Sequence, residues 1–250
     1  VDSRERYLQD LGTDRVWGLP FAAAPDLHNP VRELANAANR DLAFAGTYYA
    51  HRFPERRAQM DLLLGAAVRA GARMESGLDI FSRMLGREDR YQFPAPFDHY
   101  VRGALTYAQM LTAYRAYKVF LNVNSVTTSP SMCARRIFEI TASGTPVVST
   151  PSAAIGEFFA ADEVLEVSDA ATAEQLLRAL VANPALRDRM VHRGQRRIWT
   201  GHTYCHRVNE VLERVGCSSS VVADPTVSAL AVPNRPHQVE HVLRQLAGQR

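Results

Sequence analysis

Short apolar segments alternate with longer amphipathic ones along most of this chain, and this alternation limits the folds open to it. Buried strands are predicted at 42–46, 118–124, 145–149 and 164–167, with a weaker strand or a loop at 91–94. Helices are predicted at 54–71, 106–117, 129–144, 172–181, 185–200 and 203–215. Because parallel strands need crossover connections of this length, the sequence predicts an α/β fold, a doubly wound parallel sheet with helices on both faces.

Two of these helices carry end signals of their own. Pro54 suits the first turn of a helix, and Gly71 suits its C-terminal cap. The hydroxyl of Thr106 can cap the next helix.

Changes in composition divide the chain into four parts. Residues 1–39 contain prolines and little periodicity, which is typical of a segment that crosses between domains. Residues 40–215 form the predicted Rossmann-like domain, and 216–225 are a linker. A strand at 226–232 and a helix at 237–246 follow, and this short tail cannot bury a core alone. We interpret 226–250 as the truncated start of a second domain.

Composition excludes several classes of protein. The 29 basic and 26 acidic side chains give a net charge of +3, too small to indicate nucleic acid as a partner. No apolar run approaches the roughly 18 residues that a transmembrane helix needs. Cys133, Cys205 and Cys217 are scattered and odd in number, which indicates reduced thiols, a cytoplasmic protein and no metal site.

The segment 127–139 has the clearest chemical content, because a hydroxyl-rich loop follows a buried strand and opens a helix. With the helix beginning near Ser131, the free amides of its first turn would form an anion site. Arg135 and Arg136 add charge suited to a diphosphate, and Glu139 can accept hydrogen bonds from a sugar diol. The alternative is that Ser131 only caps the helix, the arginines are solvated, and Glu139 pairs with one of them.

A second candidate is the loop after the first strand. Gly46 lets the backbone approach a ligand closely, Thr47 follows it, and Arg52 could reach a phosphate. The alternative is a tight turn with a surface arginine. The chain has no G-x-G-x-x-G and no P-loop motif, so dinucleotide and P-loop sites are disfavoured.

The stretch 187–207 is rich in arginine and histidine, which raises the hypothesis of nucleic-acid binding. Its apolar positions are those of an ordinary amphipathic helix. No aromatic residues interleave with the charge as in proteins that bind single strands. We therefore interpret it as a solvated helix face and expect no nucleic-acid partner.

The sequence from Lys118 to Val148 resembles the C-terminal, nucleotide-sugar-binding half of GT-B glycosyltransferases, and most closely their CgeB-like group. The segments 44–49, 114–118 and 202–207 occur in the order found in that group. The resemblance implies that Glu139 holds the ribose of the donor. It places the first Glu of the family's paired-glutamate motif at Met132, so one contact to the donor sugar is in doubt. The other positions that it implies for donor binding are Gly46, Arg52, the base loop ending at Leu105, and Asn124 with Ser125.

The resemblance also implies a function. The chain would bind a nucleotide-diphosphate sugar, such as a UDP-sugar, and the departing diphosphate would be stabilised by a helix terminus and basic side chains, with no metal or other cofactor. The acceptor site and any general base would lie on a second Rossmann-like domain preceding Val1, so no catalytic residue is assigned and the fragment alone is expected to be inactive. The alternative is a non-catalytic binding or scaffolding module with the same fold. The tail at 227–236 is similar to the start of a family-2, GT-A glycosyltransferase domain.

Overall fold

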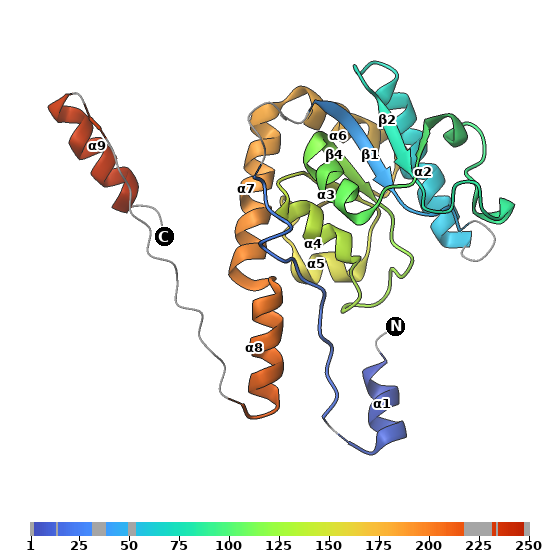
Figure 1. Cartoon of the computed structure of the whole chain (residues 1–250), viewed down its shortest axis with the longest axis horizontal. Helices are drawn as coiled ribbons and strands as arrows, with labels where there is room; N and C mark the ends of the chain where they lie inside the picture. Colours follow the sequence, from blue (N-terminus) through green and yellow to red (C-terminus); the bar gives the residue numbers. More distant parts are fainter. Residues whose placement is uncertain are drawn as a thin grey trace.

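The computed structural model of the chain describes residues 3–13, 15–31, 39–49, 54–217, 232–233 and 235–247. Its sheet has six parallel strands in the order β3-β2-β1-β4-β5-β6 (Figure 1). The strands are β1 (Arg40–Ala45), β2 (Leu78–Phe81), β3 (Val101–Gly103), β4 (Tyr117–Asn122), β5 (Val147–Ser149) and β6 (Leu165–Glu166). The strand order reverses between β1 and β4. Ligands of open α/β sheets bind beyond the carboxyl ends of the strands at such a reversal.

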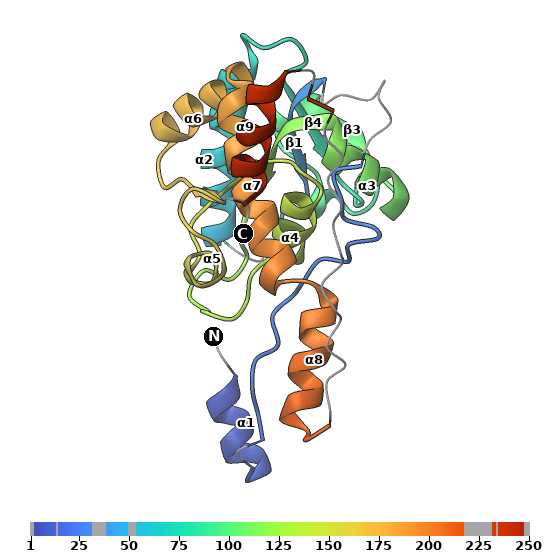
Figure 2. The same cartoon turned by 90° about the vertical axis from the view of Figure 1, so that its left-hand side faces the viewer.

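Helices cover both faces of the sheet (Figures 1 and 2). Those described are α1 (Arg4–Leu11), α2 (Pro54–Gly71), α3 (Tyr107–Ala116), α4 (Arg135–Ala142), α5 (Ala153–Phe158), α6 (Ala170–Ala182), α7 (Pro184–Gly201), α8 (Tyr204–Arg214) and α9 (Pro236–Ala247), with 3₁₀ turns η1 (Asp89–Tyr91) and η2 (Phe97–Tyr100). One apolar core joins the sheet to α2 and α6, and the other joins it to α3, α4 and α5. The predicted doubly wound α/β fold is confirmed.

Alternate side chains of the short strand β1 point to opposite faces of the sheet, so β1 contributes to both apolar cores. Leu42 and Phe44 point into the core beneath α2, and Ala43 and Ala45 point into the other. Successive residues of a strand face opposite sides of the sheet, so a continuous apolar run is required where both sides are covered. This is why β1 and β4 could be predicted from their composition.

Two arginines of the stretch 187–207, which was predicted to be a solvated helix face, bind to other parts of the chain. The Nε of Arg207 donates to the Pro20 carbonyl at 3.0 Å, and the Nε of Arg197 donates to Glu163 at 2.9 Å. These contacts fix the segment before β1 and the loop after α5 against α7 and α8. Figures 1 and 2 show α1 and α8 extending beyond the same end of the domain.

No helix among the described residues is long and apolar enough to cross a membrane.

His202, at the end of α7, makes the stability of the fold sensitive to acid. Its ring packs on Phe138 and Phe159, and its Nδ1 accepts from Arg207 at 2.7 Å. Burial, with the nearby charges of Arg207 and Arg197, lowers the pKa of His202 from 6.5 to about 4. The neutral ring is therefore the form that the folded state prefers.

We expect His202→Gln to destabilise the fold most at neutral pH and less at pH 4 to 5. A depressed folded pKa means that the stability from His202 is complete above pH 6.5 and is lost as the pH falls toward 4. Glutamine keeps an acceptor for Arg207 but cannot take up a proton. Urea unfolding of both proteins across this range is the measurement, and a loss of stability that is equal at every pH would contradict the role of His202.

Several predicted boundaries were wrong. The strands β2 and β3 and the short helix α5 were not predicted, and 91–94 is the end of η1 and a loop. The helix predicted from 129 begins at Arg135 instead. The predicted strand at 226–232 and most of the linker lie outside the described residues, whereas the predicted tail helix corresponds to α9.

Candidate functional site

A cavity of about 400 Å³ lies where the strand order reverses. Its floor is formed by the ends of β1 and β4, and its walls come from α2, from the loops that follow β2 and β3, and from the start of α4. This is the position at which a doubly wound sheet binds its ligand, and the volume is within the range of small-molecule sites. The cavity is therefore the candidate site.

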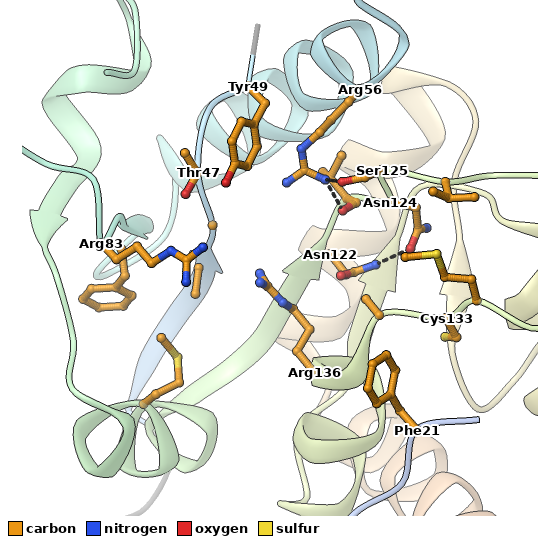
Figure 3. Close-up of a pocket in the computed structure, with 18 of the residues that line it drawn as sticks. Phe21, Thr47, Tyr49, Arg56, Arg83, Asn122, Asn124, Ser125, Cys133 and Arg136 are labelled. Carbon is orange, nitrogen blue, oxygen red and sulfur yellow. Dashed lines mark hydrogen bonds between the residues drawn. The ribbon is translucent and has the colours of Figure 1, made fainter. Parts of the chain in front are cut away.

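Three arginines from three separate elements converge on this cavity. Arg56 comes from α2, Arg83 from the turn after β2, and Arg136 from α4. Figure 3 shows their guanidinium groups pointing toward the same open space. Among the described residues that line it there is no aspartate or glutamate. The cavity is therefore cationic, and guanidinium groups suit the oxygens of phosphate.

Arg56 is the most firmly held of the three. It is 7% exposed, and its Nη1 donates to the Val123 carbonyl and to the Ser125 hydroxyl, both at 2.8 Å (Figure 3). Its Nε is buried and has no hydrogen-bond partner. Burial, followed by the charge of Arg136, lowers the pKa of Arg56 to about 10. A bound anion would relieve both the desolvation and the repulsion.

Arg136 carries a charge that no described residue pairs directly. Its guanidinium lies next to Gly46, and no hydrogen bond or ion pair joins it to the described part of the chain. Burial lowers its pKa, and this effect is opposed by Tyr114 and Glu139. Beside it, the Oδ1 of Asn122 is a buried acceptor without a partner. The cavity thus offers unsatisfied donors and one unsatisfied acceptor, which fits a ligand that has both phosphate and hydroxyl groups.

Gly46 is required where β1 enters the cavity. A Cβ at this position would lie 2.8 Å from the ring of Phe44 and 3.5 Å from a guanidinium nitrogen of Arg136. Any side chain would displace that fully buried ring. The sequence favours glycine here for the close approach of a ligand, and that stays a prediction. The structure gives a different reason for glycine, which is crowding by Phe44.

The helix start predicted near Ser131, on which the predicted anion site depends, lies further along the chain. The helix α4 has Ala134 as its N-cap, so the free amides belong to the turn that carries Arg135 and Arg136. Residues 123–134 form a loop that is tied to α5 by the bond from the Ala153 amide to the Thr127 carbonyl, 2.8 Å. The Ser131 hydroxyl lies 3.4 Å from that of Ser129 and caps nothing. The register of the family motif also needs correction: with seven residues between its two glutamates, the first would fall at Ser131, eight positions before Glu139, and not at Met132. Neither residue is acidic.

The carboxylate of Glu139 is buried and is turned toward partners within the chain. Glu139 is 3% exposed, and it accepts hydrogen bonds from the hydroxyls of Tyr114 at 3.1 Å and Tyr107 at 3.3 Å. The Nε of Arg135 lies 3.0 Å from it, and the Nε2 of the buried His28 lies 3.6 Å away. Glu139 does not line the cavity. In this conformation Glu139 affects the site through its charge, which raises the pKa of Arg136 and so opposes the effect of burial.

The structure brings most of the predicted site residues together and separates a few. The cavity is lined by Gly46, Thr47, Leu105, Asn124, Ser125, Met132 and Arg136. It is not lined by Ser131, Arg135 or Glu139, and Arg52 lies outside the described residues. Arg56, Arg83 and Asn122 were missed. Arg56 and Arg57 are indistinguishable in the sequence, so only the helix phase relative to the sheet could have selected Arg56.

The fold and the cavity together define a Rossmann-like domain with a cationic ligand site at the reversal of strand order. Residues 31–213 match the family model described as "Glycosyl transferase-like", which covers well over half of the chain. The chain belongs to this glycosyl transferase-like family. No curated protein matches it.

Solved structures similar to this chain include several proteins that act on carbohydrates. Sucrose-phosphate synthase from Thermosynechococcus elongatus has a TM-score of 0.58 at 18% identity, over 85% of this chain and 55% of that one. TarM from S. aureus, in a complex containing UDP, has a TM-score of 0.57 at 14% identity, over 86% and 42%. AviGT4, a glycosyltransferase of avilamycin A biosynthesis, has a TM-score of 0.54 at 21% identity, over 85% and 61%. These likenesses show the fold, which matches the C-terminal domain of GT-B proteins, and the chain spans roughly half the length of the structures it matches.

Proposed function

We propose that this chain is the nucleotide-sugar-binding half of a GT-B glycosyltransferase of the CgeB-like group. The observation that carries the proposal is the cavity at the β1–β4 reversal, whose described lining includes three arginines and no carboxylate. A nucleoside diphosphate supplies the complementary charge. The apolar side chains of Phe81, Leu105 and Met110 line the same cavity and offer a surface for the base.

The same arginines would assist the transfer step. When the bond between the sugar and the diphosphate breaks, negative charge grows on the departing phosphate. Fixed donors aimed at that charge stabilise the transition state. We assign this role to Arg56 and Arg136, together with the amides at the start of α4. The acceptor and any general base belong to a second domain in this proposal.

The alternative is a binding module that has kept the fold without transfer. Its support is that Ser131 and Met132, the two positions considered for the first glutamate of the family motif, are not acidic. Assays of a longer chain that includes the proposed second domain would distinguish the two functions. Donor affinity without transfer or donor hydrolysis would identify the binding module.

UDP is expected to stabilise the chain against unfolding. At about one hundred times its Kd, a ligand that binds only the folded state adds about 2.7 kcal/mol to the free energy of unfolding. Thermal and urea unfolding with UDP, pyrophosphate and uridine are the measurements. We expect UDP and pyrophosphate to stabilise and uridine to have little effect, because the arginines recognise the diphosphate. The absence of stabilisation by any nucleoside diphosphate would contradict the proposal.

The ribose contact predicted for Glu139 stays a prediction, and it can be tested apart from the diphosphate site. A ribose contact would require the carboxylate to exchange one of its tyrosine partners for the ligand. Glu139→Gln should then weaken the binding of UDP but leave the binding of pyrophosphate unchanged. Equal weakening of both ligands would instead indicate that Glu139 acts only through Arg136.

Two finer assignments also stay proposals. We propose a cytoplasmic setting because Cys133, Cys205 and Cys217 are all free thiols. We also keep the proposal that residues 226–250 begin a second, GT-A glycosyltransferase domain.

A further inference from the structure

A second cavity, of about 410 Å³, opens on the same edge of the sheet. It lies at the carboxyl ends of β5 and β6, beside the first turns of α2. The two cavities are neighbours: Arg56 lines the first, and Gln59, one helical turn later, lines the second. Likewise, Val126 lines the first and Thr127 the second. A ligand or a pair of ligands could therefore occupy both.

The chemistry of the second cavity differs from that of the first. Hydroxyls of threonine and serine, the amide of Gln59 and the carboxylate of Glu166 line it, and its described lining contains no arginine, lysine or histidine. Leu62, Pro151 and Val167 supply apolar surface. A carboxylate without a cation disfavours phosphate. Closely spaced hydroxyl, amide and carboxylate groups next to apolar surface suit a neutral molecule that carries both hydroxyl groups and C–H faces.

Polar atoms in this cavity lack partners. Ser152 is only 6% exposed, and its buried Oγ makes no hydrogen bond. Glu166 Oε1 accepts from the Ser152 amide at 2.8 Å, and Gln59 Oε1 accepts from the Thr150 hydroxyl at 2.9 Å. Among the described residues, the second oxygen of Glu166 and the amide nitrogen of Gln59 are left without partners. Of these three atoms only the Ser152 Oγ is buried, since Glu166 is exposed and Gln59 is half-buried. Buried polar groups are normally satisfied, so the Ser152 hydroxyl points to a ligand, and Glu166 and Gln59 have free atoms on the same cavity with which to bind it.

We propose that this second cavity binds a neutral saccharide, beside the diphosphate in the first cavity. The choice of a saccharide among polyhydroxylated molecules rests on the proposed function. Its source is either the glycosyl group of the bound donor or a separate saccharide. The chemistry recognised is the same in both cases, a set of vicinal hydroxyls that bridge Glu166, Gln59 and Ser152.

The test is a set of backbone amide NMR titrations of the whole chain. The probes are the methyl glycosides of glucose, galactose and N-acetylglucosamine, then UDP, then UDP-glucose. We expect at least one glycoside to shift the amides of Ser152, Ala153 and Ser168 at millimolar concentrations. We expect UDP to shift Gly46 and Arg136 instead. If neither a glycoside nor UDP-glucose shifts the second set, the inference is wrong; if UDP fails to shift the first set, the proposed function is wrong.

The same titrations identify the source of the saccharide. Shifts in the second cavity with UDP-glucose but not with UDP indicate the glycosyl group of the donor. Shifts caused by a glycoside while UDP-glucose is bound indicate a separate saccharide. Either result supports the second cavity as a saccharide site.

Two variants of α5 make a matched pair. Ala153 is exposed and lines the cavity, so Ala153→Trp should fill it and weaken saccharide binding at least tenfold without changing UDP affinity. Gly156→Ala is the control, because a Cβ at Gly156 meets no atom within 4 Å. Glu166→Gln, which keeps an acceptor for the Ser152 amide, should weaken saccharide binding at least threefold. Unchanged saccharide affinity in Ala153→Trp would overturn the inference.

Discussion

Arg136→Ala is expected to weaken UDP binding at least tenfold and to leave the unliganded chain as stable as before. Arg136 lines the cationic cavity and has no hydrogen bond or ion pair with a described residue, so its removal breaks neither kind of bond in the described part of the chain. Loss of a charge-assisted hydrogen bond costs about 1.5–3 kcal/mol, which corresponds to a factor of ten or more in Kd. Calorimetry with UDP gives the affinity, and urea unfolding gives the stability.

Arg135→Ala is the matched control. This neighbouring side chain is 53% exposed, pairs with Glu139 and does not line the cavity. We expect its removal to change UDP affinity less than about threefold, since a half-exposed ion pair contributes little. Equal losses in the two variants would show that net charge, rather than the position of Arg136, governs binding.

The second large effect is expected from Asp79, which is buried among four strands. Its carboxylate accepts from the Nε of Arg40, the Nε of Arg102 and the hydroxyl of Tyr117, each at 2.7 Å. These partners belong to β1, β3 and β4, so one side chain of β2 joins all of them. Burial raises the pKa of Asp79, but the hydrogen bonds from Arg102, Tyr117 and Arg40 outweigh it, and the pKa is lowered overall. The network therefore weakens as the pH falls through the range where Asp79 takes up a proton.

Asp79→Ala should lower the free energy of unfolding by about 3 kcal/mol. Removal of one member of a buried charged network typically costs about 3–5 kcal/mol, and the lower end applies because Arg40 and Arg102 are half-exposed. Urea unfolding is the measurement, and Asp79→Asn, which keeps an acceptor for Tyr117, should lose less. Glu88→Ala is the control, because its pair with Arg90 is exposed and should contribute under about 1 kcal/mol. Similar small losses in both alanine variants would contradict the role of Asp79.

The elements that were predicted well carry their own local signals. The helix α2 begins at Pro54 and ends at Gly71, as its terminal residues indicate. The helix α3 begins after Thr106, which forms a capping box with Gln109. Such interactions lie within a few residues of one another, so they do not depend on the rest of the fold.

The missed strands depend on distant partners. β2 carries the charged Asp79, and β3 has only three residues, Val101–Gly103. Neither forms an apolar run. Their extended conformation is fixed by pairing with β1 and with each other, and the charge of Asp79 is satisfied only by side chains of other strands. Sequence periodicity therefore had no means of finding them.

The sequence by itself determined the parallel sheet, the helices on both its faces and the edge at which a ligand would bind, because these follow from local periodicity and from the handedness of crossover connections. Only the tertiary structure decided which arginines face the cavity. Arg56 and Arg57, and likewise Arg135 and Arg136, are adjacent and chemically identical, yet one of each pair lines the cavity and the other binds a carboxylate outside it. That choice depends on the rotation of α2 and α4 about their axes, which the packing of each helix on the sheet sets.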